Sequence, residues 1–407
     1  MPVGDYSTDF HIVPGVRLGG VPCGIKGIDQ LDLVLFEFVP GSVTAGIFTQ
    51  SHFAAAPVLV GREHLNQRES RYFLVNSGNA NAATGEEGKS DAVTCCKALS
   101  QQTGVRPNEV IPFSTGVIGE KLQVANITDA LPRLIPTLDE ANWMLAAQGI
   151  MTTDTRPKIA SRLLEIEGKV VTITGIAKGS GMIQPNMATM LTYIATDATV
   201  SKPVLQELLK SGADQSFNRI TVDSDTSTND SCMLTATGVS GVDCDAGAAR
   251  ISFQEALFSV MQELAHGIIR DGEGATKFVT VRVSGGMTRQ DCLSIAYAIA
   301  NSPLVKTALF ASDANWGRIA MAIGKADATV DHSKIDVYLG DVCLLKSGGK
   351  DKNYREEMGA KVMEQAEIAI RVELNIGNET ETVWTSDLSH EYVTINAEYR
   401  TCVQELN

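Results

Sequence analysis

Apolar residues along this chain alternate between the two-residue spacing of strands and the wider spacing of helices. Short runs rich in β-branched residues predict buried strands at residues 71–75, 110–113, 169–174 and 190–195. Apolar side chains that recur every three or four positions, with capping residues before some of them, predict helices at residues 90–102, 201–216, 253–269 and 292–300. Strand and helix signals mixed in this way predict a layered α/β or α+β fold.

The middle of the chain carries a glycine-rich turn that leads into a threonine and an apolar run. Residues 178–191 read Lys-Gly-Ser-Gly-Met-Ile-Gln-Pro-Asn-Met-Ala-Thr-Met-Leu. Ala188 is small, so its carbonyl is open to attack by the hydroxyl of Thr189, and the glycines permit a strained backbone there. A chain cut at this bond has Thr189 as a new N-terminus. Its α-amine, whose pKa is about 7.7–8.0 in short peptides, can serve as the base for its own hydroxyl.

Two features limit what short motifs can establish here. A threonine before an apolar run is, taken alone, more often an ordinary strand residue. Residues 85–90, Gly-Glu-Glu-Gly-Lys-Ser, are similar to a phosphate-binding loop, but Ala83 stands where the first glycine is required, and two glutamates would repel a phosphate. The wider sequence context therefore has to decide the interpretation.

Residues 178–191 resemble a sequence block of the ornithine acetyltransferases of arginine biosynthesis, whose bifunctional members are also glutamate N-acetyltransferases. Other blocks resemble the same family, in family order and along nearly the whole chain, at residues 54–58, 76–81, 114–118, 151–155, 221–230, 270–277, 313–318 and 392–400. The resemblance implies stacked α-β-β-α layers with a smaller C-terminal lobe, roughly residues 285–407. It also implies self-cleavage into an α chain of residues 1–188 and a β chain of residues 189–407, which assemble as a heterotetramer of two α and two β chains.

The resemblance further implies a ping-pong acetyl transfer on Thr189. The acetyl group would pass from N²-acetylornithine to Thr189 Oγ and then to glutamate, giving ornithine and N-acetylglutamate. Thr115 and Gly116 match the oxyanion-hole pair of the family. Lys178 would suit a substrate carboxylate, and Glu273 would suit a substrate ammonium or proton transfer. The residues that match substrate-binding positions of the family are Thr152, Lys178, Thr189, Glu273, Asn396 and Thr401.

The sequence departs from the family pattern at several positions. Gln184 stands where histidine is common, and Ser224 stands where glycine is frequent. The chain also continues beyond Thr401 with residues 402–407. These departures leave the nucleophile and the oxyanion pair in place.

Two other functions remain open at this point. The first is a self-cleaving aminopeptidase of the same fold, which would hydrolyse its acyl-enzyme with water. Enzymes of that type resemble proteins with a serine nucleophile, so Thr189 and the block that begins at Lys178 favour acetyl transfer. An uncleaved protein that binds an amino acid in the same pocket is the second alternative. The residues also leave open whether acetyl-CoA serves as a further acetyl donor.

Composition narrows the class of protein. The net charge of −14 argues against a nucleic-acid or anionic-membrane partner, because both require a basic surface. The N-terminus lacks an apolar signal region, and no apolar run approaches the length of a membrane span, so we expect a cytoplasmic protein. The eight cysteines have no Cys-x-x-Cys spacing and no histidines at zinc-binding distances, so we expect free thiols, no metal site and no cofactor.

Overall fold

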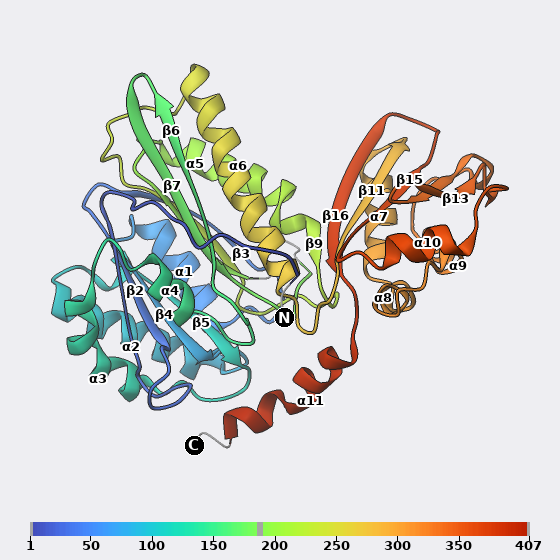
Figure 1. Ribbon diagram of the computed structural model, residues 1–407. Helices are drawn as coiled ribbons and strands as arrows, with labels where there is room; N and C mark the ends of the chain where they lie inside the picture. Colours follow the sequence, from blue (N-terminus) through green and yellow to red (C-terminus); the bar gives the residue numbers. More distant parts are fainter. Residues whose placement is uncertain (1–2, 185–189, 405–407) are drawn as a thin grey trace.

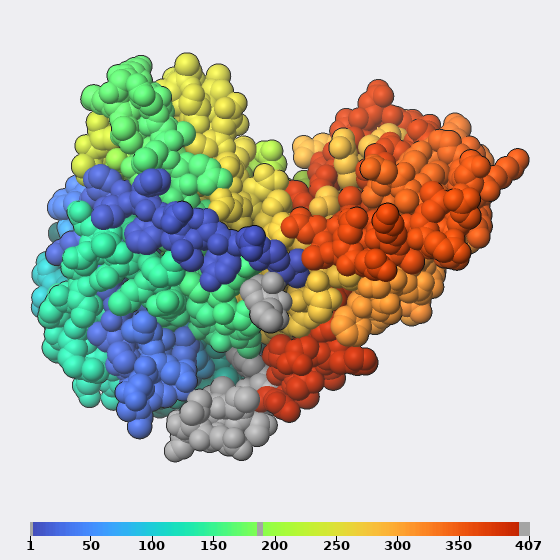
Figure 2. Space-filling model, viewed as in Figure 1, coloured from blue at the N-terminus to red at the C-terminus, as the bar shows by residue number. Residues whose placement is uncertain are grey.

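The computed structural model describes residues 3–184 and 190–404, and of residues 399–404 only the backbone. These residues form three β-sheets in two lobes, as Figure 1 shows. Two sheets stack face to face in the first lobe, and the third sheet builds the second lobe. Figure 2 shows a notch between the two lobes at the top of the view. The expected layered α/β architecture is confirmed.

The first sheet has the strand order β1-β2-β4-β5, in which β4 and β5 are parallel and the other neighbours are antiparallel. Its outer face is covered by α2 and α3, whose buried residues include Cys95, Leu99 and Leu131. Helix α1 lies against β5, and α4 lies against β1. The elements are β1 (Val16–Val21), β2 (Leu33–Phe38), β4 (Tyr72–Asn79), β5 (Val110–Val117), α1 (Ala56–Gln67), α2 (Gly85–Thr103), α3 (Val124–Leu134) and α4 (Trp143–Gly149).

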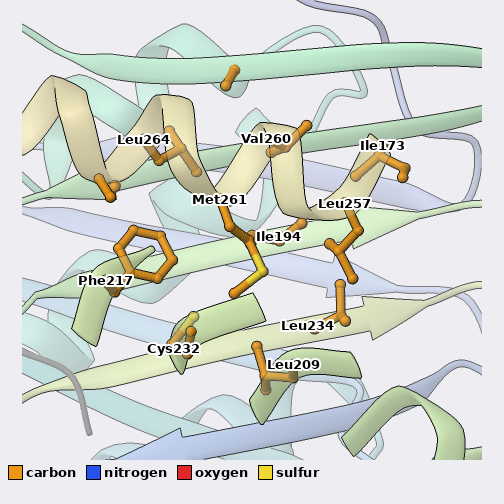
Figure 3. Packing of buried hydrophobic residues seen from close by; sticks show 14 of the residues in the cluster. Ile173, Ile194, Leu209, Phe217, Cys232, Leu234, Leu257, Val260, Met261 and Leu264 are labelled. Carbon is orange, nitrogen blue, oxygen red and sulfur yellow. The ribbon is translucent and has the colours of Figure 1, made fainter. Parts of the chain in front are cut away.

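The second sheet has the order β3-β10-β8-β7-β6, in which only β8 and β10, of the strands described, are parallel neighbours. Helices α5 and α6 cover its outer face. Figure 3 shows Leu257, Met261 and Leu264 of α6 packed over the sheet beside Ile194 and Leu234. The elements are β3 (Val43–Phe48), β6 (Lys158–Ile166), β7 (Lys169–Lys178), β8 (Leu191–Thr196), β10 (Ser231–Ala236), α5 (Lys202–Gln215) and α6 (Gly247–Arg270).

Aromatic side chains fill the space between the two sheets. Phe36, Phe73 and Phe113 of the first sheet surround Tyr193 of β8, with ring centroids 4.8–5.9 Å from that of Tyr193. All four rings are buried. Because such rings contribute large buried areas, this cluster fixes β8 firmly against the first sheet. The result is the α-β-β-α stack that the resemblance implied.

The second lobe is built on a third sheet. In the part of the chain that the structure describes, this sheet has seven strands in the order β14-β13-β12-β15-β11-β16-β9. The short strand β9 pairs with β16, opposite Trp384 and Thr385, and so joins this sheet to the first lobe. Helix α7 begins with a capped turn in which Thr288 Oγ1 accepts from the Asp291 N–H at 3.0 Å. The strands are β9 (Ile220–Thr221), β11 (Phe278–Gly286), β12 (Asp336–Leu339), β13 (Val342–Lys346), β14 (Gly349–Lys350), β15 (Glu367–Glu373) and β16 (Glu379–Ser386). The helices are α7 (Arg289–Ala300), α8 (Pro303–Phe310), α9 (Trp316–Gly324), α10 (Glu356–Met363) and α11 (His390–Gln404).

Helix α11 leaves the second lobe and runs back beneath the first, as Figure 1 shows. Short 3-10 turns complete the chain at Pro107–Glu109, Ile135–Thr137, Phe217–Arg219 and His332–Lys334. Within the described residues, no single helix is long and apolar enough to cross a membrane. Helices α7 and α8 reach that length and apolar character only together, across a 55° bend.

Candidate active site

A cavity of about 260 Å³ lies where the ends of β5 and β7 meet the starts of β8 and β10. Met190, the residue that follows Thr189, lines it. A second cavity, of about 380 Å³, lies against α6 and the N-terminal segment and contains none of the predicted site residues. The predicted residues that line the first cavity are Thr115, Gly116, Thr152, Lys178, Glu273 and Asn396.

Three predicted positions cannot be placed in this cavity. Ala188 and Thr189 lie outside the described residues, and so does the side chain of Thr401. Their assigned roles therefore stay predictions. The neighbouring Met190, on the other hand, is buried and positioned by a hydrogen bond from the Ser231 N–H to its carbonyl at 2.9 Å.

The predicted oxyanion pair lies at the end of β5, where two strands approach closely. Gly116 has a φ of +134°, and a Cβ at this position would lie 2.2 Å from the carbonyl carbon of Gly78, so only glycine fits. The hydroxyl oxygen of Thr115 accepts a hydrogen bond from Lys178 Nζ at 3.4 Å. A hydroxyl that accepts in this way keeps its own hydrogen for donation. Thr115 therefore can offer the donor that an oxyanion requires.

Lys178 lies at the end of β7 with its ammonium between two threonine hydroxyls. Its Nζ donates to Thr152 Oγ1 at 2.9 Å, in addition to the longer bond to Thr115, and its side chain is only 12% exposed. The carboxylate of Asp154 lies 4.0 Å away. Because an ammonium has three hydrogens and both close partners are neutral, Lys178 has a donor left for an anionic group in the cavity.

A buried ionic network holds the backbone next to Lys178 in place. Lys158 Nζ lies 2.6 Å from a carboxylate oxygen of Asp154 and 2.7 Å from one of Asp271, and all three side chains are at most 2% exposed. Asp154 also accepts from the N–H groups of Gly179 at 2.7 Å and Thr152 at 3.0 Å. The same carboxylate thus fixes the two backbone segments that carry Thr152 and Lys178.

The charges in this network keep Asp154 ionised. Burial alone would raise its pKa, but the positive charges of Lys158 and Lys178 and the hydrogen bonds to its oxygens hold the pKa of Asp154 well below its ordinary value. Asp154 and Asp271 lie in the family-like blocks at residues 151–155 and 270–277, but the resemblance assigned them no role. A lysine four residues after an aspartate, at the first position of a strand, was the available signal.

Replacing Lys158 by methionine tests this network. The change leaves two buried carboxylates without their cation, so the folded state should lose about 3–5 kcal/mol of stability. The midpoint of denaturant unfolding measures the loss. Lys202→Met is the matched control, because its pair with Glu69 is exposed and such pairs contribute about 0–1 kcal/mol. Equal midpoints for the two variants would contradict a structural role for Lys158.

Glu273 enters the cavity from the loop after α6 and is held from two sides. Its carboxylate accepts from Asn396 Nδ2 of α11 at 2.7 Å, and its N–H donates to the carbonyl of Ser180 at 2.9 Å. A Cβ on Gly181 would lie 2.4 Å from the carboxylate carbon, so the glycine makes room for Glu273. Glu273 and Asn396 therefore act together, although they are 123 positions apart in the sequence.

The segment before β10 joins the halves of the cavity. It belongs to the family-like block at residues 221–230, whose residues received no role from the sequence. Asn229 Nδ2 donates to the carbonyls of Ser114 at 2.8 Å and Ala80 at 2.6 Å, which ties this segment to the oxyanion strand. Asp230, the next residue, is buried and lines the cavity. A polar Thr-Asn-Asp run directly before a buried strand was the signal that sequence analysis left unused.

Gln184 and Ser224, which depart from the family pattern, are both described. Gln184 Oε1 accepts from Asn301 Nδ2 at 3.0 Å. Ser224 has a φ of +66°, a conformation that glycine adopts at lower cost. In the described part of the chain, no cluster of three or more His, Cys, Asp or Glu side chains is placed to hold a metal ion.

Comparisons with known proteins agree on one family. The sequence pattern of the ArgJ family matches residues 17–401. The arginine biosynthesis bifunctional protein ArgJ of Pseudomonas syringae pv. tomato is 54% identical over 396 residues, which cover 96% of this chain and 98% of that protein. The crystal structure of the same-named protein of Bacillus halodurans is 39% identical, with a TM-score of 0.48, and covers 50% of this chain and 96% of the solved chain. The ornithine acetyltransferase of Mycobacterium tuberculosis, solved with ornithine, is 32% identical, with a TM-score of 0.39, and covers 43% of this chain and 94% of the solved chain.

Proposed function

This chain belongs to the ArgJ family, and we propose that it carries out its acetyl transfer on Thr189 in the cavity described above. The protein is an acetyltransferase of arginine biosynthesis, and it moves the acetyl group from N²-acetylornithine to glutamate. The observation that carries the proposal is that six residues from separate parts of the sequence, all assigned to the site by the family resemblance, line one cavity together with Met190, which follows Thr189 in the chain.

Thr189 becomes the nucleophile when the chain cuts itself after Ala188. The hydroxyl attacks the carbonyl of Ala188, and the C–N bond between Ala188 and Thr189 breaks, which gives an ester and frees the α-amine of Thr189. Water then hydrolyses the ester, which leaves a carboxylate on Ala188 and restores the hydroxyl of Thr189. The amine then takes the hydroxyl proton when Oγ attacks the acetyl carbonyl of N²-acetylornithine. Support for this assignment comes from the position of Met190 at the cavity wall and from the strain-tolerant glycines that precede the bond.

The residues around Thr189 stabilise the oxyanion and bind the charged groups of the substrate. The Thr115 hydroxyl and the backbone of Gly116 stabilise the oxyanion of each tetrahedral intermediate. Lys178 binds the substrate carboxylate with its free donor, and Thr152 orients Lys178 through the 2.9 Å hydrogen bond. Glu273, held by Asn396, binds the ammonium of the ornithine side chain. Thr401 is proposed to contact the substrate from the end of α11.

The finer features of the enzyme follow the family resemblance. The products of cleavage, residues 1–188 and 189–407, stay associated and pair into a heterotetramer in the cytoplasm. The reaction uses neither a metal nor a bound cofactor, because Thr189 supplies its own base. Acetyl-CoA is proposed as a second acetyl donor, since relatives of this chain are named bifunctional proteins. An assay of acetyl transfer to glutamate with N²-acetylornithine and with acetyl-CoA tests both activities.

A ping-pong reaction requires an isolable acetyl-enzyme. Mixing the purified protein with N²-acetylornithine, and no glutamate, should add one acetyl group to the fragment that begins at Thr189, and mass spectrometry of the two fragments measures it. Initial rates at several concentrations of both substrates should give parallel double-reciprocal lines. Intersecting lines would instead indicate direct transfer in a ternary complex.

The same experiment separates the competing functions. An aminopeptidase would discharge its acyl-enzyme to water at the same rate with or without glutamate, whereas the transferase requires glutamate for rapid turnover. A protein that only binds an amino acid would show neither cleavage nor acetylation.

A further inference from the structure

The second cavity, of about 380 Å³, lies between α6 and the start of the chain, apart from the substrate site. The start of the chain is fixed there, because the Val3 N–H donates to the Arg270 carbonyl at 2.8 Å, at the end of α6 (Figure 1). A volume of this size is typical of a site for a small molecule. The positively charged side chains that line the cavity, besides His266, are Arg156, Lys158, Arg162 and Arg270.

Three of these four cations already have a carboxylate partner. The pairs, each at 2.7 Å, are Arg162 with Glu263, Arg270 with Glu367 and Lys158 with Asp271. Arg156 differs from them, because no carboxylate of the described residues forms an ion pair with its guanidinium. Asp5, which also lines the cavity, is exposed to solvent and takes part in no described ion pair. The cavity therefore has one cation more than its ion pairs neutralise.

The guanidinium of Arg156 is buried and has a donor without an acceptor. The residue is 3% exposed, its Nη1 donates to the Gly4 carbonyl at 3.3 Å, and no described residue accepts from its Nη2. Burial lowers the pKa of Arg156 from its ordinary value, and the charge of Asp271 opposes only part of this shift. A buried cation without a counter-ion is costly, so an anion beside it is favourable.

The ring of Tyr6 covers the guanidinium on the side of the chain's start. Its centroid lies 4.3 Å from Arg156 Cζ. Tyr6 is 47% exposed, so its side chain has room to turn towards solvent and to open Nη2 to a ligand in the cavity. A charge-assisted hydrogen bond is stronger than a cation–π contact at an exposed site, so an anion can displace the ring.

The single excess charge selects the kind of anion. A guanidinium matches a planar carboxylate through two parallel hydrogen bonds, and a carboxylate carries one negative charge whereas a phosphate group carries more. The apolar side chains of Pro157, Ile159 and Leu264 also line the cavity and suit a short carbon chain. We propose that this cavity binds a small monocarboxylate through Arg156, at a site separate from the substrate cavity.

Trifluorobutanoate, a carboxylate with a CF₃ group at its apolar end, tests the proposal by fluorine NMR of the full chain. Because Lys178 can also bind a carboxylate, the parent protein for these measurements is Lys178→Met. The parent should bind the probe at millimolar concentrations, the range expected for a ligand of so few atoms. Adding Arg156→Met should weaken binding by about tenfold or more, since the change removes a charge-assisted hydrogen bond.

Arg250→Met is the matched control, because Arg250 belongs to the same helix α6 but does not line the cavity, and it pairs with Glu207 at 2.7 Å. This variant of the parent should bind the probe as the parent does. Arg156→Lys keeps the charge without the planar fork, so its affinity should lie between those of the parent and Arg156→Met. Butanoate should displace the probe from the parent, whereas butanamide, which has a similar shape and no charge, should not.

Four results would overturn the proposal. The first is a parent that does not bind the probe, and the second is equal affinity of Arg156→Met and Arg250→Met. The third is displacement by butanamide as strong as by butanoate, which would show an apolar pocket only; this comparison requires no change at Arg156 and stands even if Arg156→Met fails to fold. The fourth is displacement by inorganic phosphate at lower concentrations than by butanoate, which would show that the site prefers a more highly charged anion.

Discussion

Replacing Thr189 by alanine is expected to leave the chain uncut and to abolish acetyl transfer. One oxygen atom performs both reactions, because Thr189 Oγ attacks the Ala188 carbonyl in cleavage and the acetyl carbonyl in turnover. Loss of a nucleophile of this kind lowers kcat on the order of 10⁶ in enzymes that form acyl intermediates. Denaturing electrophoresis of the purified protein should show one band of full length, and N-terminal sequencing should find no chain that begins at residue 189.

Two further variants show whether the loss is specific to that hydroxyl. Thr189→Ser keeps a hydroxyl and an α-amine, so it should still be cut at the same bond and should form an acetyl-enzyme. Thr192→Val removes a buried hydroxyl that has no hydrogen-bond partner in the described structure, three residues further along, and should behave as the wild type. Cleavage of Thr189→Ala at the same bond, or acetyl transfer by it, would show that another group is the nucleophile.

Much of the first lobe could be predicted from the spacing of apolar residues, because its strands and helices bury one continuous face. The strand predicted at residues 169–174 and the helix predicted at residues 253–269 appear as parts of β7 and α6. The strand predicted at residues 71–75 is also correct, but β4 continues to Asn79. Three of its added residues, Asn76, Ser77 and Asn79, are polar and buried, and Ser77 Oγ donates to the Gly149 carbonyl at 2.6 Å. A hydrogen-bond partner 72 positions away leaves no trace in the local spacing.

Residues 85–90 illustrate the opposite case, a local motif whose form misleads. They are similar to a phosphate-binding loop in composition, yet they form the first turns of α2. Glu86 and Glu87 lie in the first turn, where negative charge is favourable beside the helix N-terminus. Rejection of a phosphate loop at this place is therefore consistent with the helix that the structure shows.

The composition of the cavity was predictable only through family resemblance. Thr115, Lys178 and Glu273 carry ordinary side chains, and nothing in their spacing indicates that they meet. The ionic network of Lys158, Asp154 and Asp271 was not predicted. Lys158 and Asp271 are 113 positions apart, so their pairing leaves no local pattern in the sequence. Ser224 was recognised as unusual, and its positive φ gives the physical reason why glycine is frequent there.

Thr115→Ala is expected to lower kcat by on the order of 10² to 10³ with little change in KM. The hydroxyl accepts from Lys178 Nζ at 3.4 Å and keeps its hydrogen for the oxyanion, so it binds the transition state more strongly than the planar acetyl group of the ground state. Steady-state kinetics with N²-acetylornithine and glutamate measure both constants. Thr115→Ser keeps the donor and should retain most of the activity.

The ratio of the two effects decides which role Thr115 has. Loss of its hydroxyl also removes one hydrogen bond from Lys178, but Thr152, at 2.9 Å, remains to orient the ammonium, so substrate binding should change little. A raised KM with an unchanged kcat would therefore show that Thr115 acts through Lys178 on the ground state and stabilises no oxyanion. Unchanged kinetics would make the end of β5 a structural element, in which Gly116 serves only the close approach to Gly78. The predicted fall in kcat alone fits only a donor that acts as negative charge develops on the acetyl oxygen.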